Sequence, residues 1–178
     1  FRQPEWSALA LLEDPAWVRQ VHDDFIAAGA DVIITNNYAV VPFHLGDDRF
    51  AARGAELTAL SGRLAREAAA AADRDILVAG SIPPLFGSYQ PELFDPERAP
   101  LMLATIAKEL APFVDFFVAE TQSSLSEVMA SAAAVQHFGK PLWLSATLLD
   151  EPAPPAATLR SGESIEALCA AAVKSGAA

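Results

Sequence analysis

The sequence predicts an α/β fold with a parallel sheet, and three observations support this prediction. Short apolar runs alternate with longer segments of helical periodicity along the chain. The runs lack polar alternation, as expected of parallel strands covered on both faces. The helical segments carry start signals, including a proline after an N-cap residue and a capping box. Regular alternation of strands and helices indicates either an open doubly wound sheet or a closed barrel.

Four strands are expected, near residues 31–36, 76–81, 115–120 and 142–147, adjacent in that order. An open doubly wound sheet normally has a glycine-rich phosphate-binding turn after an early strand, and the sequence has no G-x-G-x-x-G or Walker A pattern. A (β/α)8 TIM barrel is therefore favoured. A complete barrel needs about 250 residues and eight strands, so roughly half of one is expected here.

Five helices are expected before, between and after the strands. The first has Asp14 as its N-cap and Pro15 in its first turn, and Val18, Val21 and Phe25 form its apolar stripe. The other stripes expected to face the core are Leu57/Leu60/Leu64/Ala68, Leu103/Ile106/Leu110, Leu125/Val128/Ala132/Val135 and Ile165/Leu168/Cys169/Ala172/Val173.

Length and composition predict one domain over residues 1–178, because 52% of the residues are hydrophobic and the chain is short. Its net charge of -11 disfavours nucleic acid and anionic membrane surfaces as partners. No apolar stretch approaches the roughly 20 residues that span a bilayer. A single cysteine and the lack of a signal peptide predict a cytoplasmic protein. The domain is expected to be truncated at both ends, because Phe1 is not an initiator methionine and the sequence stops in an apparent helix-to-strand turn.

Polar side chains follow every expected strand. The groups are Thr35-Asn36-Asn37-Tyr38, Gly80-Ser81, Glu120-Thr121-Gln122-Ser123-Ser124 and Ser145-Ala146-Thr147. The carboxyl ends of parallel strands form one rim, where barrel enzymes keep their chemistry. Hydroxyls, amides, a phenol and a carboxylate suit a small zwitterionic ligand, since the carboxylate can pair with an ammonium group.

Several of these residues also have a structural interpretation. Glu120 could form a structural ion pair, although a carboxylate that ends an apolar strand favours a ligand-binding role. Tyr38 could simply fill the mouth of the barrel. Ser123, Ser124 and Thr147 could cap the helices that follow.

The histidines and the cysteine are not expected to take part in chemistry. His22 lies beside two aspartates in the first helix and is expected to be solvated, and Cys169 is expected in the core within its apolar stripe. The histidines lack metal-ligand spacing, and the sequence has no nucleophile elbow or visible catalytic triad.

Several segments together have a more specific pattern, in which Ala-Gly-Ala-Asp precedes a Thr-x-x-Tyr strand end and Glu-Thr follows later. The segments are Trp6-Ser7-Ala8, Val21-His22-Asp23-Asp24-Phe25, Ala28-Gly29-Ala30-Asp31-Val32-Ile33, Thr35-Asn36-Asn37-Tyr38, Gly80-Ser81, Ala119-Glu120-Thr121 and Leu144-Ser145-Ala146-Thr147. Over nearly the whole chain, this pattern resembles the homocysteine S-methyltransferases. That family includes betaine- and S-methylmethionine-dependent enzymes and the homocysteine module of cobalamin-dependent methionine synthase.

The resemblance implies a zinc-dependent methyltransferase that makes methionine. A methyl group would pass from a sulfonium-type donor, S-methylmethionine or S-adenosylmethionine, to the zinc-bound thiolate of homocysteine. Glu120 matches the family's glutamate that binds the homocysteine ammonium, and Tyr38 matches a catalytic tyrosine near the reacting sulfur. Further substrate-pocket positions are those of Thr35, Asn36, Ser81 and Ser145.

The family's metal ligands have no counterparts in this chain. Its Asp-Gly-Gly strand would precede Phe1 and its zinc-binding cysteines would follow Ala178, so residues 1–178 would be roughly the second to fifth βα units. No metal ligand is expected here, and the fragment alone is expected to be inactive. The loop from Ser81 to Tyr89 is unlike that of the betaine-dependent branch, which makes betaine the less favoured donor.

Two alternatives remain open. A lyase or aldolase of another TIM-barrel family should have a lysine on a strand, but Lys108 and Lys174 lie in expected helices and Lys140 precedes a strand. A catalytically inactive barrel could keep the amino-acid pocket without zinc. The sequence specifies neither the methyl donor nor the oligomeric state.

Overall fold

The computed structural model describes residues 3–150 and 157–177. The helices in these ranges are α1 (Ala8–Glu13), α2 (Pro15–Ala27), α3 (Pro42–Leu45), α4 (Asp47–Ala71), α5 (Ala99–Leu110), α6 (Leu125–Val135) and α7 (Ile165–Ser175), with short 3-10 helices η1 (Pro91–Leu93) and η2 (Gln136–Phe138). The strands are β1 (Val32–Ile34), β2 (Leu77–Ile82), β3 (Phe116–Gln122) and β4 (Leu142–Ala146).

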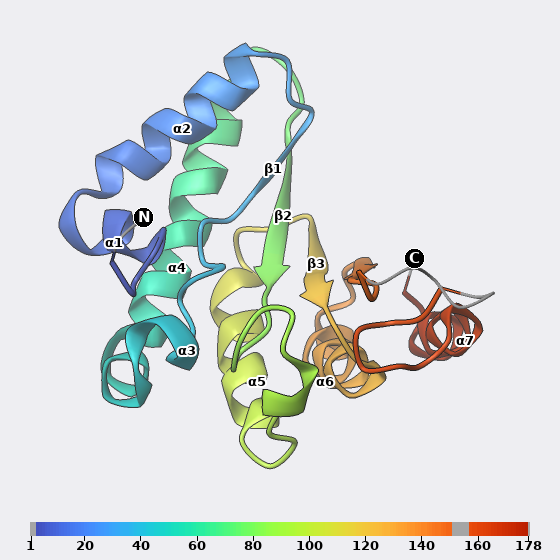
Figure 1. Ribbon diagram of the computed structural model, residues 1–178. Coiled ribbons are helices and arrows are strands. Elements are labelled where there is room, and N and C mark those ends of the chain that lie inside the picture. Colours follow the sequence, from blue (N-terminus) through green and yellow to red (C-terminus); the bar gives the residue numbers. More distant parts are fainter. Residues whose placement is uncertain (1–2, 151–156, 178) are drawn as a thin grey trace.

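The four strands form one parallel sheet in the order β1-β2-β3-β4. This confirms the predicted strand order and direction. Because all the strands run the same way, their carboxyl ends meet along one edge, and the arrowheads of β2 and β3 in Figure 1 point toward it. Within the described ranges β1 and β4 are the edge strands, so each has one side without a neighbouring strand.

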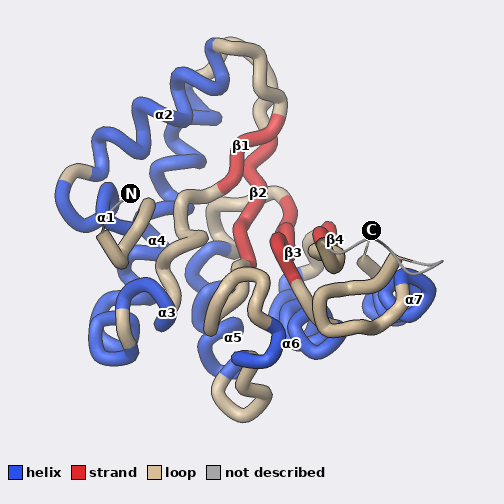
Figure 2. Tube along the Cα trace, in the orientation of Figure 1, coloured by secondary structure: helices blue, strands red, loops and turns tan. Residues whose placement is uncertain are grey.

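Helices cover one face of the sheet. Figure 1 shows α4, α5 and α6 side by side along this face, and Figure 2 shows the strands together at the centre of the molecule. The main core lies between the two layers and includes buried strand residues such as Ile33, Val78 and Phe117. Those side chains alternate with the ones that point to the other face of the sheet.

The opposite face of the sheet carries a smaller apolar cluster, made by Ala79, Phe116 and Val118. At its margins Leu77 and Trp143 are each 48% exposed. The apolar strands predict cover on both faces. In the part of the chain that the structure describes, helices cover only one of them.

Local signals fix the helix ends as the sequence predicts. Asp14 caps α2 by accepting a hydrogen bond from the backbone N–H of Ala16, and Gly29 reverses the chain behind this helix with a φ of 104°. Ser124 and Glu127 form the predicted capping box of α6.

The apolar stripe of α2 is only partly buried, which corrects two expectations. Val18 is buried, but Val21 and Phe25 are 49% and 60% exposed. His22, expected to be solvated, is buried instead, and its Nε2 has no hydrogen-bond partner in the described residues. Val21, His22 and Phe25 all line a pocket beside β1, so the apolar stripe faces open space there.

Cys169 is exposed, contrary to the expectation that it lies in the core. The physical reason is that α6 is the main helix against which α7 packs in the described residues. None of the residues of α7 is buried. Its apolar stripe is therefore only partly covered in the described residues, and Val173 is strongly exposed. None of the helices within 3–150 and 157–177 is both long and apolar enough to cross a membrane.

Candidate functional site

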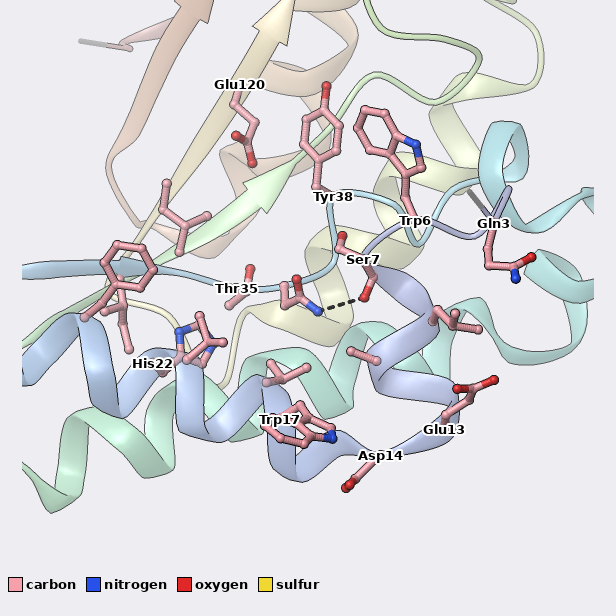
Figure 3. A pocket seen from close by; sticks show the side chains of 18 of the residues that line it. Gln3, Trp6, Ser7, Glu13, Asp14, Trp17, His22, Thr35, Tyr38 and Glu120 are labelled. Atoms are coloured by element: carbon pink, nitrogen blue, oxygen red, sulfur yellow. Dashed lines mark hydrogen bonds between the residues drawn. The ribbon is translucent and has the colours of Figure 1, made fainter. Parts of the chain in front are cut away.

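A pocket of about 970 Å³ opens beside β1, between that strand and helices α1 and α2. Figure 3 shows Tyr38 and Glu120 at one end of this pocket, with His22 and Trp17 along the helical wall. Four of the predicted site residues line it, namely Thr35, Asn36, Tyr38 and Glu120. Side chains from the ends of β1 and β3 thus share one cavity, as a common rim of parallel strands requires.

Glu120 lies near the carboxyl end of β3 and accepts a hydrogen bond of 2.5 Å at its Oε1 from the Ser81 hydroxyl of β2. No lysine, arginine or histidine forms an ion pair with it in the described residues, and its Oε2 has no hydrogen-bond partner there. Burial raises the pKa of Glu120, while the Ser81 hydrogen bond lowers it by a smaller amount. The structural ion pair is therefore not observed, and a carboxylate with a free oxygen faces the pocket.

Thr35 contributes mainly to the joint between β1 and β2. Its hydroxyl donates to Oδ1 of Asn37 at 2.6 Å and accepts from the backbone N–H of Ser81 at 3.0 Å. The Asn37 amide in turn donates to the backbone oxygen of Ser81 at 2.9 Å. This closed network holds Ser81 at the level of Glu120.

Asn36 and Tyr38 connect the rim to neighbouring loops. Asn36 donates from Nδ2 to the backbone oxygen of Ser7 at 3.2 Å, the dashed line in Figure 3. The Tyr38 hydroxyl lies 2.6 Å from Oγ of Ser88 in the loop after β2. The Tyr38 side chain is half-buried, lines the pocket and is hydrogen-bonded at its hydroxyl.

The serine and threonine residues farther along the rim have different roles. Ser145 lies on β4, is exposed and does not line the pocket that contains Glu120. Ser124 is a helix cap, whereas the Oγ of Ser123 lies 2.8 Å from Oγ1 of Thr147. Ser145 is thus the one predicted pocket residue without a contact to this group.

Three residues with structural roles at the site were not singled out from the sequence: Asn37, Ser88 and Gln122. Asn37 and Gln122 are both buried, although asparagine and glutamine are mostly exposed in proteins. The sequence shows that they lie close to Asn36 and Glu120 along the chain, but it does not show that their side chains are buried. Ser88 lies in a proline-rich loop with no pattern that indicates its partner.

The sequence model of the homocysteine S-methyltransferase family matches residues 1–178. The chain belongs to that family. It is 33% identical over 171 residues to a homocysteine S-methyltransferase of Escherichia coli strain K12, covering 82% of this chain and 52% of that enzyme. It is 30% identical over 148 residues to betaine--homocysteine S-methyltransferase 1 of Xenopus tropicalis, covering 77% of this chain and 34% of the relative.

A solved structure from the same family has the same fold. It is the homocysteine methyltransferase MmuM from Escherichia coli in its oxidized form, which superimposes with a TM-score of 0.81 at 27% identity. The match covers 99% of this chain and 64% of that one. The chain therefore spans between about a third and two thirds of the length of these relatives.

The described residues do not fit the zinc site that the family resemblance implies. Within 3–150 and 157–177, no group of three or more histidine, cysteine, aspartate or glutamate side chains could hold a metal ion. The single cysteine, Cys169, lies exposed on α7. The polar groups that these residues do bring into the pocket include the Glu120 carboxylate and the Tyr38 hydroxyl.

Proposed function

We propose that this chain is the substrate-binding part of a homocysteine S-methyltransferase, which transfers a methyl group to the thiol of homocysteine and gives methionine. One observation carries the proposal. The carboxylate of Glu120 faces the pocket with one oxygen free and no cation paired to it in the described residues. A half-buried carboxylate without a cation is costly, and an ammonium group of the substrate would supply the missing charge.

Homocysteine carries the ammonium group that this site needs. In the proposed complex its ammonium group donates a hydrogen bond to the Glu120 carboxylate, while the hydroxyl of Ser81 keeps its hydrogen bond to Oε1. Tyr38 reaches the same pocket from the segment after β1 and contacts the substrate near its sulfur. Thr35 and Asn36 shape the wall, and Ser145 contacts the ligand only if the pocket extends across the open face of the sheet toward β4.

We propose a sulfonium-type methyl donor, S-methylmethionine or S-adenosylmethionine. The support for this choice is the expectation from the sequence that the loop from Ser81 to Tyr89 is unlike that of the betaine-dependent branch. The zinc that activates the thiol would be bound by cysteines outside residues 1–178, so no step of the reaction is assigned to a metal here. A cytoplasmic location is part of the same proposal, supported by the single cysteine.

We also propose that the sheet is part of a closed (β/α)8 barrel, roughly its second to fifth βα units. Three features support this: the strand order, the open side of β1, and an apolar sheet face without helical cover in the described residues. A closed barrel pairs every edge strand and fills its interior with side chains. In such a barrel Ile34, Leu77 and Trp143, each at least 44% exposed here, would face the interior.

The decisive experiment is steady-state kinetics on Glu120→Gln in the complete natural protein that contains this chain. The substitution keeps the shape and removes the charge, so a charge-assisted hydrogen bond worth about 1.5–3 kcal/mol should be lost. This corresponds to roughly a tenfold to hundredfold rise in the KM for homocysteine. Zinc content, measured on the same samples, should not change.

Glu67→Gln is the matched control, because Glu67 is an exposed glutamate on α4 that faces Arg63 across the helix surface. It should leave the KM unchanged. Unaltered KM and kcat in Glu120→Gln would show that Glu120 is structural. An inactive wild-type protein that still binds homocysteine would instead favour the non-catalytic barrel. A lyase or aldolase is disfavoured further, since none of the lysines at 108, 140 and 174 lies on a strand.

A further inference from the structure

The backbone is irregular where β3 ends. The pairing of β3 with β4 shifts register between Ala119 and Gln122. Between these residues Thr121 has a φ of 61°, in the left-handed region. A β-branched residue in that region is a genuine outlier, and strain of this kind persists only where surrounding contacts impose it. Irregularities in a strand next to an active site commonly redirect a side chain, and the residue before this one is Glu120.

The side chain of Gln122 holds this irregular backbone from within the protein. It is only 1% exposed. Its Nε2 donates to the backbone oxygen of Glu120 at 2.9 Å and to that of Ile82, on the adjacent strand β2, at 3.2 Å. Its Oε1 accepts from the Ser131 hydroxyl of α6 at 3.3 Å. One buried amide therefore connects the end of β3 to β2 and to a helix.

We propose that Gln122 is a positioning residue that aims the Glu120 carboxylate at the ammonium group of the substrate, an inference that rests on the proposed function. The hydrogen bond to the Glu120 oxygen fixes the peptide plane that follows Glu120. The hydrogen bond to Ile82 fixes the distance to β2, where the neighbouring residue Ser81 binds the Glu120 carboxylate at 2.5 Å. Glu120 is thus held at its backbone by Gln122 and at its carboxylate by Ser81.

The Gln122–Ile82 and Ser81–Glu120 hydrogen bonds both connect β2 to β3. If the Gln122 amide is lost, the Glu120 peptide can rotate and Thr121 can relax toward an ordinary strand conformation. The carboxylate would then shift relative to Ser81 and to the pocket. Because a displacement of about 1 Å is enough to weaken a directed ion pair severely, recognition of the ammonium should suffer before the fold does.

The test compares homocysteine with 4-mercaptobutyrate, which has the thiol and the carboxylate but lacks the amino group. We would measure kcat/KM for both thiols in the complete natural protein, with S-methylmethionine as donor. Gln122→Met keeps the length of the side chain and removes the hydrogen bonds. Gln122→Asn keeps the amide but is too short to reach both carbonyls. Ser61→Ala is the control, because Ser61 is also fully buried and donates to a backbone oxygen, that of Thr58, at 2.8 Å.

We expect each Gln122 variant to reduce the preference for homocysteine over 4-mercaptobutyrate by about tenfold, through the homocysteine KM alone. The rate with 4-mercaptobutyrate and the result for Ser61→Ala should not change. The inference is overturned if Glu120→Gln loses the preference while Gln122→Met and Gln122→Asn keep it, or if the Gln122 variants weaken both thiols equally. If Glu120→Gln itself keeps the preference, the proposed function fails first.

Discussion

Replacing Glu127 by alanine should destabilise the protein through two backbone groups that lie just after the proposed site. The Glu127 side chain is buried, and its Oε2 accepts from the backbone N–H of Ser123 at 2.6 Å and of Ser124 at 2.9 Å. These N–H groups precede the first turn of α6, where the helix dipole also favours a negative charge. Alanine would leave both of them buried without a partner.

The expected loss can be worked out from these two hydrogen bonds. An unsatisfied buried N–H costs about 1–3 kcal/mol, and removal of the carboxylate relieves part of its own desolvation. The net decrease in the free energy of unfolding should therefore be about 2–4 kcal/mol, which in a domain of this size corresponds to a decrease in Tm of about 4–16 °C. Glu127→Gln keeps an acceptor and should lose less.

The pH dependence of the same variants gives a second measurement. Burial raises the pKa of Glu127 above its ordinary value of 4.5, and hydrogen bonds from Ser123 and Ser124 offset only part of that. The folded state therefore binds more protons than the unfolded state between the ordinary and the raised pKa. The stabilising contribution of Glu127 is greatest below pH 4.5 and decreases as pH rises through the raised pKa, so Glu127→Ala should lose more stability at low pH than at neutral pH.

Urea unfolding followed by circular dichroism, at pH 4.5 and 7.5, measures both effects. The matched control is Glu166→Ala, because Glu166 lies in the first turn of α7 but is exposed. It should change the unfolding midpoint much less than Glu127→Ala does. Equal midpoints for Glu127→Ala and the wild type would refute the assigned role of the two N–H groups.

Two further predictions concern charged groups. Burial raises the pKa of Glu120 above its ordinary value of 4.5. The homocysteine KM should therefore rise as pH falls through the raised pKa, because the protonated side chain has lost the charge that pairs with the ammonium group. A pH series of KM values checks this, and the dependence should be absent in Glu120→Gln. Asp115→Asn should lower stability by about 1 kcal/mol in urea unfolding, because Asp115 accepts from Arg66 at 2.8 Å and from the Val78 N–H at 2.6 Å. That value allows for solvent screening of a pair whose side chains are 36% and 37% exposed, and no change would contradict it.

The sequence predicted the sheet well because its signals are local. Each apolar run is bounded by turn residues, and two helices carry a side-chain cap that the sequence shows directly, Asp14 for α2 and Ser124 for α6. Connections between consecutive strands of this length favour parallel neighbours, so the order followed from alternation. Glu120 could be predicted as a site residue for the same reason, since the apolar run that it follows can be recognised from neighbouring residues alone.

The arrangement around Glu120 could not be predicted from local signals. Whether Ser81 reaches its carboxylate depends on the register between β2 and β3, in which Ser81 pairs with Val118. A single-residue slip would place Ser81 on the other face of the sheet. The register shift near Thr121 and the burial of Gln122 are likewise set by contacts between strands. A sequence pattern indicates which residues lie at the rim but not which of them meet.

The two helices whose burial was predicted wrongly have a common physical explanation. Helical periodicity shows that one side of a helix is apolar, but it does not show what covers that side. On α2 the side chains of Val21 and Phe25 face the pocket beside the open side of β1, and α7 has no buried residue. Exposed apolar stripes on the first and last parts of the described chain are what the proposed barrel requires. There, further strands and helices would pair with β1 and β4 and cover both stripes.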